Sequence, residues 1–596
     1  MRRFGWFAPF LVLATPLRAQ AVRYEVSIVQ GQFHVSADFP TRGKDTLFVS
    51  LPAWSPGNYE IQNYARYLHD FGARNTTGQP LQWDRADKDT WRVWPAGSER
   101  VTVDFDYKPE RIDLSLARTV ADFAQFLGTN LFLFEEGHLA RPAEVRFRLP
   151  AGWQVTTALK GPVNGIYTAG DYHELADAMT FLGRYSLDSL QAGGKWIRLA
   201  VWPAADYTAP VARNLRAGVA KMVPVQNRIM GETPYEVYTI FFNVIHEPID
   251  FGGGLEHASS QYDIMPANAF ADPLSGKLGN FMYPLLSHEF FHLWNVKRIR
   301  PVEMWPYDYH AEQYTPLLWW SEGVTDYYAD LTNIRSGLWS TNEFLSNLGS
   351  DNPESDIAQI ESTPEPWSVE DGSEATWINE VYVNSSQLYY PKGAIIGFLI
   401  DIAIRDATNN AHSLDEVMRA LYVRYYRQGR GFSTTDLLNE LRAAGMPDVD
   451  TFYRRYIDGR EPLPYDSIFV KAGLRLRRDT GPLLGVSAQP NAEGESQVNA
   501  VLPGGAAAAA GVQPGDILTN VGDVRVTADA NWAQAFRSRY RGKMGQPLTI
   551  AVRRGGQTLT LTTTVREGPI GPGILERLPD PTPKQARIWQ GLATGL

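Results

Sequence analysis

The sequence predicts a multidomain α+β protein with an antiparallel β-sandwich at the N-terminus, a mostly helical domain in the middle and a smaller, β-rich domain near the C-terminus. Residues 22–193 contain runs in which apolar and polar residues alternate, broken by Pro and Gly, as is typical of an antiparallel sandwich. In residues 194–465 a few strand patterns are followed by long helical ones, and in residues 474–566 short strands and Gly-rich turns return. A chain of 596 residues is long enough for three or four domains, each with its own core.

The alternating segments of the first domain place their apolar side chains on one face of each strand. They are Tyr24, Val26 and Ile28; Phe33, Val35, Ala37 and Phe39; Val101, Val103, Phe105 and Tyr107; and Val145, Phe147 and Leu149. A period of two predicts strands that bury one face. We expect this sandwich to pack against the middle domain and to help close its cleft.

The composition argues against a nucleic-acid partner. The 56 basic and 66 acidic residues give a formal charge of −10, a mild excess that is spread along the chain. The 17 Trp, 28 Tyr and 27 Phe predict large cores and domain interfaces, with some rings lining a substrate cleft. The chain has no cysteine, so disulfides are excluded and stability must come from packing and from metal.

The first 21 residues read as a secretory signal peptide. Arg2 and Arg3 are followed by an apolar run over residues 4–14, which is too short to span a membrane. Residues 19–21 (Ala-Gln-Ala) fit a cleavage site, so the mature chain is expected to begin near Val22. No other run is long and apolar enough for a transmembrane helix. We expect an exported protein, periplasmic if the source is a Gram-negative bacterium and otherwise secreted.

The most informative motif is the HExxH sequence at residues 288–292. His288 and His292 are four residues apart, so on a helix they share one face and both imidazoles can reach one metal ion. Glu289 would then lie beside a metal-bound water, where it can take a proton. Pro284 suits the first turn of this helix, and nothing from Leu285 to Lys297 breaks it. The alternative is two ordinary histidines on an amphipathic helix.

A zinc site needs a third ligand, and Glu322 is the best candidate. It lies in an apolar stretch that Thr315 would cap and Pro316 would begin, and a carboxylate in a buried helix requires a partner or a metal. Gly323 is costly inside a helix, which suggests that something packs closely against it. Asp326, one turn after Glu322, is a candidate to accept a hydrogen bond from a ligand histidine; the alternative is an ordinary surface acid.

Within the middle domain, Ser413 and Ser433 each begin a pattern that resembles a helix capping box. Residues 363–384 are irregular and rich in acids and Trp. A loop of that length inside a compact domain is often functional, so we expect it to rim the substrate cleft.

Together these motifs resemble the gluzincin class of metallopeptidases and, more narrowly, the glycyl aminopeptidase family. The resemblance rests on residues 288–298 and 319–328, on 54–66 in the N-terminal domain, on the glycine-rich segment 253–257 and on the tyrosine helix beginning at 389–394. These segments stand in the family's order and span most of the chain. The resemblance implies a thermolysin-like catalytic domain with bound Zn²⁺, although cobalt or manganese can also occupy such a site.

The resemblance also implies roles for residues outside the metal site. Glu256 would bind the free ammonium group of a peptide, with Gly253 and Gly254 allowing the backbone of the substrate to approach. Tyr390 would donate a hydrogen bond to the oxyanion of the tetrahedral intermediate, and Tyr389 is the alternative donor. The plain alternatives are a solvated loop acid for Glu256 and core packing for either tyrosine.

The function that follows is a zinc aminopeptidase acting on peptides with a free N-terminus, preferring small first residues such as Gly or Ala. In it Glu289 takes a proton from the metal-activated water and passes it to the leaving amine. Two other functions compete with it. One is an exported zinc endopeptidase, which has no reason to place Glu256 at the amine end of the substrate. The other is a noncatalytic peptide-binding scaffold with structural zinc, which would normally need four protein ligands.

The C-terminal region resembles bacterial PDZ domains over its whole length. Residues 501–506 and 510–518 carry the resemblance, and residues 553–556 read as the final hairpin turn. Residues 484–486 would receive a peptide C-terminus by strand addition, although the groove of this module can equally be empty. In the Pro- and Gly-rich tail, residues 567–596, the segment 582–592 is expected to form a docked helix.

Overall fold

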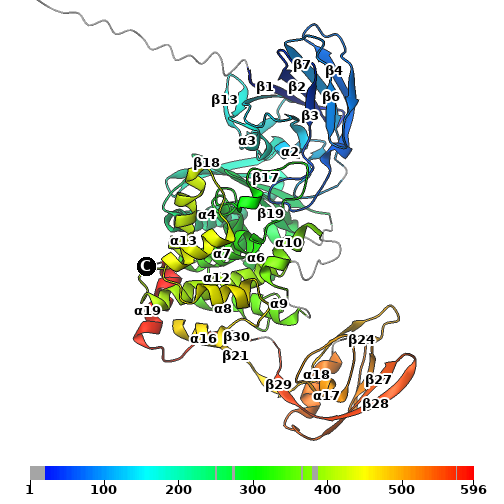
Figure 1. Cartoon of the computed structure of the whole chain (residues 1–596), viewed down its shortest axis with the longest axis vertical. Coiled ribbons are helices and arrows are strands. Elements are labelled where there is room, and N and C mark those ends of the chain that lie inside the picture. Colours follow the sequence, from blue (N-terminus) through cyan, green and yellow to red (C-terminus); the bar gives the residue numbers. More distant parts are fainter. Residues whose placement is uncertain are drawn as a thin grey trace, which may run out of the picture.

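The computed structural model describes residues 20–109, 111–247, 252–271, 276–363, 367–378, 387–529, 531–571 and 573–595, without the side chains of 276–281. The expected signal peptide therefore lies almost entirely outside the described residues. Figure 1 shows a β-rich N-terminal domain at one end, a helical middle domain, and a β-rich C-terminal domain at the other end. The predicted α+β multidomain fold is confirmed.

The N-terminal domain is built from three sheets. The largest has the order β13-β14-β11-β1-β2-β7-β4 and is joined by sheets β10-β3-β6-β5 and β12-β15-β9-β8. The strands of the large sheet are β1 (Val22–Val29), β2 (Gln32–Pro40), β4 (Leu68–Asn75), β7 (Arg100–Tyr107), β11 (Ala143–Arg148), β13 (Lys160–Val163) and β14 (Ile166–Ala169). Those of the smaller sheets are β3 (Leu47–Ser50), β5 (Trp83–Arg85), β6 (Thr90–Val93), β10 (Phe134–Glu135), β8 (Arg118–Val120), β9 (Phe123–Phe126), β12 (Gln154–Thr157) and β15 (Thr180–Gly183).

Alternation along the strands buries one face, as the sequence predicts. Phe33, Val35, Ala37 and Phe39 of β2 are all fully buried, while the residues between them are partly exposed. The prediction of a purely antiparallel sandwich is wrong in one place, because β1 and β11 run parallel. A long connection separates these two strands, so no hairpin turn forces them to be antiparallel.

The middle domain begins with a mixed sheet of order β16-β17-β18-β20-β19. Its strands are β16 (Ser186–Ala192), β17 (Lys195–Trp202), β18 (Val237–Ile245), β19 (Gly253–Glu256) and β20 (Ser260–Pro266). Because the expected boundary at residues 193–194 falls in the turn between β16 and β17, we propose that the catalytic domain begins before Ser186. The edge strand β19 lies against helix α6, which places the end of this strand beside the HExxH motif.

The helices of the middle domain surround α6 (Gly276–Phe291), α7 (Val324–Arg335) and α12 (Tyr389–Ala407). The others include α4 (Ala209–Met230), α8 (Thr341–Leu348), α9 (Asp356–Ser362), α10 (Val369–Ala375), α13 (Leu414–Arg424), α14 (Thr434–Ala443) and α16 (Tyr465–Phe469). The predicted cap at Ser433 is confirmed, since its hydroxyl accepts from the N–H of Asp436; Ser413 makes no side-chain cap. Residues 364–366 and 379–386 of the expected cleft-rimming loop lie outside the described residues.

Helix α6 differs from its prediction at both ends. It begins at Gly276, so Pro284 lies inside the helix and not in its first turn. Pro284 removes one backbone donor, but the buried side chains of Leu286 and Phe290 anchor the helix in the core. The helix ends at Phe291, and the expected continuation to Lys297 is a series of irregular turns in which the N–H of Lys297 bonds to the carbonyl of His292.

The C-terminal domain is a sheet of order β23-β24-β25-β27-β28, with β26 paired to β25, covered by two helices. Its elements are β23 (Val486–Pro490), β24 (Ser496–Val501), β25 (Ile517–Val521), β26 (Val524–Arg525), β27 (Pro547–Arg554), β28 (Gln557–Thr564), α17 (Ala506–Ala510) and α18 (Asn531–Tyr540). Two short antiparallel ribbons connect it to the middle domain: β21 (Leu474–Arg477) with β30 (Ile574–Arg577), and β22 (Thr480–Pro482) with β29 (Glu567–Pro569).

After strand β30 the chain returns to the middle domain. Helix α19 (Pro583–Thr594) packs on α7 and α12, with Ile588 and Leu592 fully buried. The prediction of a docked helix in the tail is therefore confirmed. One continuous hydrophobic core runs through the N-terminal and middle domains and includes α19, whereas the C-terminal domain has a separate core. No described helix has the length and hydropathy needed to cross a bilayer.

Candidate active site

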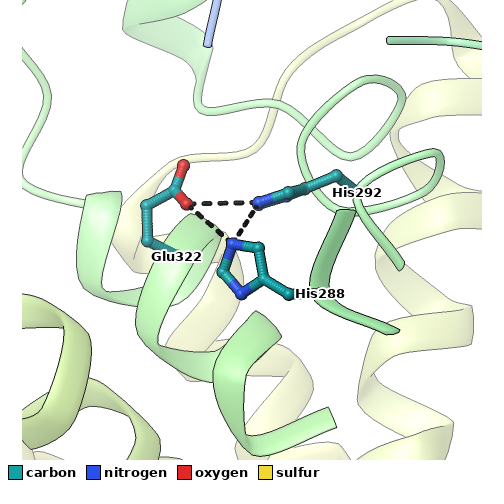
Figure 2. Close-up of side chains that lie close together, drawn as sticks. All are labelled: His288, His292 and Glu322. Carbon is teal, nitrogen blue, oxygen red and sulfur yellow. Dashed lines mark hydrogen bonds and ion pairs between the residues drawn. The ribbon is translucent and has the colours of Figure 1, made fainter. Parts of the chain in front are cut away.

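His288, His292 and Glu322 converge on one point inside the middle domain (Figure 2). The two Nε2 atoms lie 2.7 Å apart, and Oε2 of Glu322 lies 3.4 Å from Nε2 of His288 and 3.2 Å from that of His292. Zinc–ligand bonds of about 2.0–2.2 Å in a tetrahedron place ligand atoms roughly 3.3 Å apart. The two distances to Glu322 match this spacing, whereas the two Nε2 atoms lie closer together than two zinc ligands would.

The hydrogen bonds of the two histidines support a cation at this point. Nδ1 of His288 lies 2.7 Å from Oδ1 of Asp326, and Nδ1 of His292 lies 2.6 Å from the carbonyl oxygen of Asn295. Because both partners can only accept, each Nδ1 donates and each Nε2 of a neutral ring presents a lone pair. Two lone pairs and a carboxylate oxygen then face one another, which is the donor set that a divalent metal such as zinc needs.

The local charges favour a cation as well. Burial opposes protonation of His288, but the carboxylates of Asp326 and Glu322 outweigh it and hold the pKa of His288 well above its usual value. Burial opposes ionisation of Glu322, yet His292 and His288 hold its pKa well below the usual range. The site thus stabilises positive charge beside an ionised carboxylate.

Glu322 comes from a π-helical turn, where the sequence patterns predict an ordinary helix. Trp319–Gly323 form a π-helical turn that leads into α7, a local widening that is frequent at functional sites. The close packing expected at Gly323 is confirmed, because a Cβ there would lie 2.4 Å from the carbonyl oxygen of Tyr389. Helix α12 thus packs closely against the π-turn, and Tyr390 near its start lies close to His288.

Glu289 lies in the last turn of α6, directly after His288, and is buried. Its Oε2 has no hydrogen-bond partner among the described residues. Burial, with the nearby charge of Glu256 in addition, raises its pKa well above the usual value, while His288 opposes the shift. A Cβ on Gly254 would lie 2.4 Å from the carboxyl group of Glu289, so only glycine lets strand β19 pass this close.

Glu256 ends β19 and lies beside Glu289 and His292, within 4.8 Å between their polar atoms. It is 3% exposed, and its Oε1 lacks a partner in the described part of the chain. Burial raises its pKa, opposed by His292 and Lys297. Gly253 lies nearer the strand start, with Leu114 of the N-terminal domain beside it.

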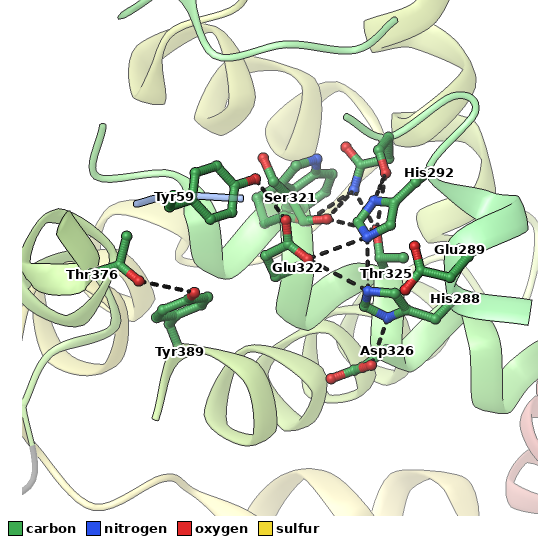
Figure 3. Close-up of polar contacts among 12 residues, drawn as sticks. Tyr59, His288, Glu289, His292, Ser321, Glu322, Thr325, Asp326, Thr376 and Tyr389 are labelled. Atoms are coloured by element: carbon green, nitrogen blue, oxygen red, sulfur yellow. Dashed lines mark hydrogen bonds and ion pairs between the residues drawn. The ribbon is translucent and has the colours of Figure 1, made fainter. Parts of the chain in front are cut away.

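The two tyrosines of α12 face different surroundings. This helix begins at Tyr389 and not at Pro391, as the sequence had suggested. The Tyr389 hydroxyl contacts Oγ1 of Thr376 at 3.2 Å, away from the histidines (Figure 3). The Tyr390 ring stacks on that of Tyr389 and has its centroid 6.3 Å from that of His288. Burial and Glu322 raise the pKa of Tyr390 well above its usual value, so the phenol remains a donor.

The N-terminal domain also reaches the site, in line with its expected packing against the middle domain, and does so through the family-like segment 54–66. The hydroxyl of Tyr59 donates to Oε1 of Glu322 at 2.7 Å. A Cβ on Gly57, whose φ is +111°, would lie 2.5 Å from Oε2 of Glu256. The buried Lys297 pairs with Asp177 at 2.7 Å and donates to the carbonyl of Pro56 at 3.3 Å.

Three family models match the chain. A peptidase M61 N-terminal domain matches residues 23–184, an M61 glycyl aminopeptidase domain matches residues 282–396, and a PDZ domain matches residues 482–565. The second of these matches contains the whole His288–His292–Glu322 cluster together with Tyr390. A search of curated protein sequences finds no match.

A solved structure shares the fold over nearly the whole chain. An aminopeptidase N family protein from Idiomarina loihiensis is 22% identical; the match covers 95% of this chain and 99% of that one, with a TM-score of 0.77. Two further structures are more distant, each 13% identical with a TM-score of 0.46. Leukotriene A4 hydrolase from Saccharomyces cerevisiae matches 74% of this chain and 68% of its own. Aminopeptidase A from Legionella pneumophila matches 91% of this chain and 56% of its own. The chain thus contains segments that match the M61 peptidase N-terminal domain, the M61 glycyl aminopeptidase domain and the PDZ domain, and it is a peptide hydrolase.

Proposed function

We propose that the protein is a zinc-dependent aminopeptidase that removes the N-terminal residue from peptides. The observation that carries this proposal is the buried carboxylate of Glu256, which lies beside Glu289 and His292 with one oxygen unpaired among the described residues. A buried carboxylate oxygen without a donor is costly. The ammonium group of a peptide N-terminus supplies both the charge and the N–H donors that this oxygen lacks.

The proposed metal ligands are His288, His292 and Glu322, with Asp326 fixing the tautomer of His288 through its Nδ1–H. A zinc ion held there would polarise the scissile carbonyl and acidify a bound water. Cobalt or manganese would also suit this set of nitrogen and oxygen ligands.

The remaining steps fall to side chains of this chain. Glu289, held beside the cluster with a raised pKa, takes a proton from the water and returns it to the leaving amine. Tyr390, whose phenol keeps its proton, donates to the oxyanion. Glu256 holds the ammonium group, and Gly253 and Gly254, which carry no side chain, would let the backbone of the substrate approach β19. The glycyl aminopeptidase family suggests a small first residue, chiefly Gly or Ala.

An exported endopeptidase and a noncatalytic scaffold are the alternatives. An endopeptidase would leave Glu256 without a purpose, and a scaffold would not need Glu289 beside three metal ligands. The PDZ domain is proposed to bind peptide C-termini by strand addition, because β23 lies at the edge of the described sheet next to residues 484–486. We also propose export to the periplasm or the exterior, which sequencing the N-terminus of the mature protein would test.

The first experiment is hydrolysis of Gly, Ala and Leu chromogenic amides by the full chain from Val22, with and without a chelator, beside an N-acetylated counterpart. The proposal expects chelator-sensitive release from the free-amine substrates only, fastest for Gly or Ala. Equal cleavage of acetylated and free substrates would support the endopeptidase instead. No cleavage with zinc bound would favour the scaffold.

A further inference from the structure

The carboxylate of Glu322 uses its two oxygens for different partners. Oε2 faces Nε2 of His288 and His292 at 3.4 and 3.2 Å, whereas Oε1 accepts a hydrogen bond from the hydroxyl of Tyr59 at 2.7 Å. Figure 3 shows Tyr59 on the side of Glu322 that faces away from the two histidines. We propose that Tyr59, supplied by the N-terminal domain, is a positioning residue that makes Glu322 a ligand through one oxygen only. This inference rests on the proposed role of Glu322 as a metal ligand.

The chemistry of the pair fixes the direction of this hydrogen bond. An ionised carboxylate only accepts, so the phenol of Tyr59 must donate. Glu322 is 3% exposed and Tyr59 is 8% exposed, so a hydrogen bond between them meets little competition from bulk water. The donor both satisfies Oε1 and prevents the carboxylate from turning that oxygen toward the metal.

Single-oxygen binding matters for a catalytic site. Three protein ligands and one open position are what such a zinc site requires, because the open position holds the water. If Glu322 bound through both oxygens, its second oxygen would crowd that position. Tyr59 would thus keep the coordination number low, as partners of ligand residues do in other metal sites.

Tyr59 is held in place by contacts between the two domains. The N–H of Ala53 and Nε1–H of Trp54 donate to carbonyl oxygens of Tyr309 and Asp308, each at 2.7 Å. On the other side, Lys297 donates to the carbonyl of Pro56. The ring of Trp377 packs edge-on against those of Trp54 and Tyr59, at centroid distances of 5.0 and 6.0 Å. Contacts with three parts of the middle domain therefore hold the segment that carries Tyr59.

The test is Tyr59→Phe, which removes only the hydroxyl. Its matched control is Tyr64→Phe, since Tyr64 is also buried in the same segment but bonds to Ser55 at 2.8 Å and not to Glu322. We expect Tyr59→Phe to weaken zinc binding about 10- to 100-fold in competition with a chromogenic chelator, while Tyr64→Phe leaves it unchanged. The unfolding temperatures of the metal-free variants show whether either change acts through folding.

Cobalt substitution supplies a second measurement that does not depend on turnover. The visible absorption of bound Co²⁺ weakens as its coordination number rises. We expect a weaker band in Tyr59→Phe than in Tyr64→Phe, as the freed oxygen of Glu322 joins the metal. Equal zinc affinity and an equal cobalt band in the two variants would overturn the positioning role.

A Glu322→Gln variant separates this inference from the proposed function. If Glu322→Gln keeps the zinc affinity of the unmodified protein, the ligand assignment itself is wrong. If Glu322→Gln loses zinc but Tyr59→Phe binds it normally, only the role of Tyr59 is wrong. Loss in both variants, with Tyr64→Phe unaffected, supports both.

Discussion

At the scale of single residues, Glu289 is the group on which hydrolysis should depend most. It is buried, its Oε2 is unpaired among the described residues, and it is not one of the three proposed metal ligands. Glu289→Gln should therefore retain zinc while kcat falls about 10²- to 10⁴-fold, the range for loss of a general base. Metal content and steady-state kinetics on Ala amides check this expectation. Substantial activity in the variant would rule out Glu289 as the base.

Gly57 is the second residue for which the geometry makes a sharp prediction. Its φ of +111° disfavours any side chain, and a Cβ there would lie 2.5 Å from Oε2 of Glu256. Gly57→Ala should displace Glu256 and lower kcat/KM for free-amine substrates by roughly 100-fold, as small misplacements of binding groups do. Zinc affinity should stay the same, because Glu256 is not a proposed ligand. Gly78→Ala, at a positive φ with open space around it, controls for backbone strain alone.

Sequence patterns identified much of this site, and for a physical reason. His288, Glu289 and His292 are linked by helical spacing, so their meeting is a local property that four residues encode. Glu322 was found because an acid in an apolar helix needs a partner. Tyr59 could not be found in this way, because its contact with Glu322 spans 263 positions and depends on how two domains dock. No local spacing carries that information.

At the scale of elements, helix α19 should be part of the catalytic domain although it follows the PDZ domain in sequence. Ile588 and Leu592 are fully buried, and Nε of Arg335 donates to the carbonyl of Leu592 at 2.9 Å. Each of Ile588→Ala and Leu592→Ala should lower the free energy of unfolding by about 2–5 kcal/mol. Chemical denaturation followed by Trp fluorescence measures this. Gln590→Ala, on the exposed side of the helix, is the control.

The PDZ domain, by contrast, should be removable without loss of the active site. Arg477 and Ile574 are paired in the first ribbon, so residues 478–573 can be replaced by an Asn-Gly turn. The shortened protein should fold and cleave small amides at the rate of the full chain, since the PDZ core is separate. Chain termination after residue 473, which removes α19 as well, should instead give an unstable product. Thermal unfolding and amide hydrolysis of both forms compare them.

Helices and strands can be predicted from the sequence where a pattern of apolar residues repeats, and less well where backbone hydrogen bonds change their partners. The alternation in β2 and the cap at Ser433 follow from local rules. The end of α6 at Phe291 and the π-turn at Trp319–Gly323 do not, because both depend on hydrogen bonds that change by one residue under tertiary packing. The parallel pairing of β1 with β11 was missed for a related reason: nothing in either strand specifies the direction of a distant neighbour.

At the scale of the whole molecule, the N-terminal and catalytic domains share one hydrophobic core and make charged contacts across their interface. His310 of the catalytic domain lies 2.9 Å from Oε1 of Glu136 and 3.3 Å from Oδ2 of Asp89, both in the N-terminal domain. Hydrogen bonds to these two carboxylates raise the pKa of His310 to about 10, against the opposing effect of burial. The protonated ring therefore links the two domains.

This raised pKa predicts how stability changes with pH. A group with a raised folded-state pKa adds stability that is complete below its unfolded-state value, about 6.5, and that is lost as the pH rises through about 10. The unfolding temperature of His310→Gln should therefore lie furthest below that of the unmodified protein near pH 6, and the gap should narrow toward pH 10. A gap that is constant with pH would contradict the charged link.

The return of α19 to the catalytic domain has a consequence for the order in which the chain is completed. A ribosome makes residues 583–594 only after the entire PDZ domain has been synthesised. The hydrophobic surface that Ile588 and Leu592 cover on the catalytic domain stays uncovered until that moment. The middle domain is thus begun before the PDZ domain but completed only after it, so its final assembly waits until the PDZ domain has been made.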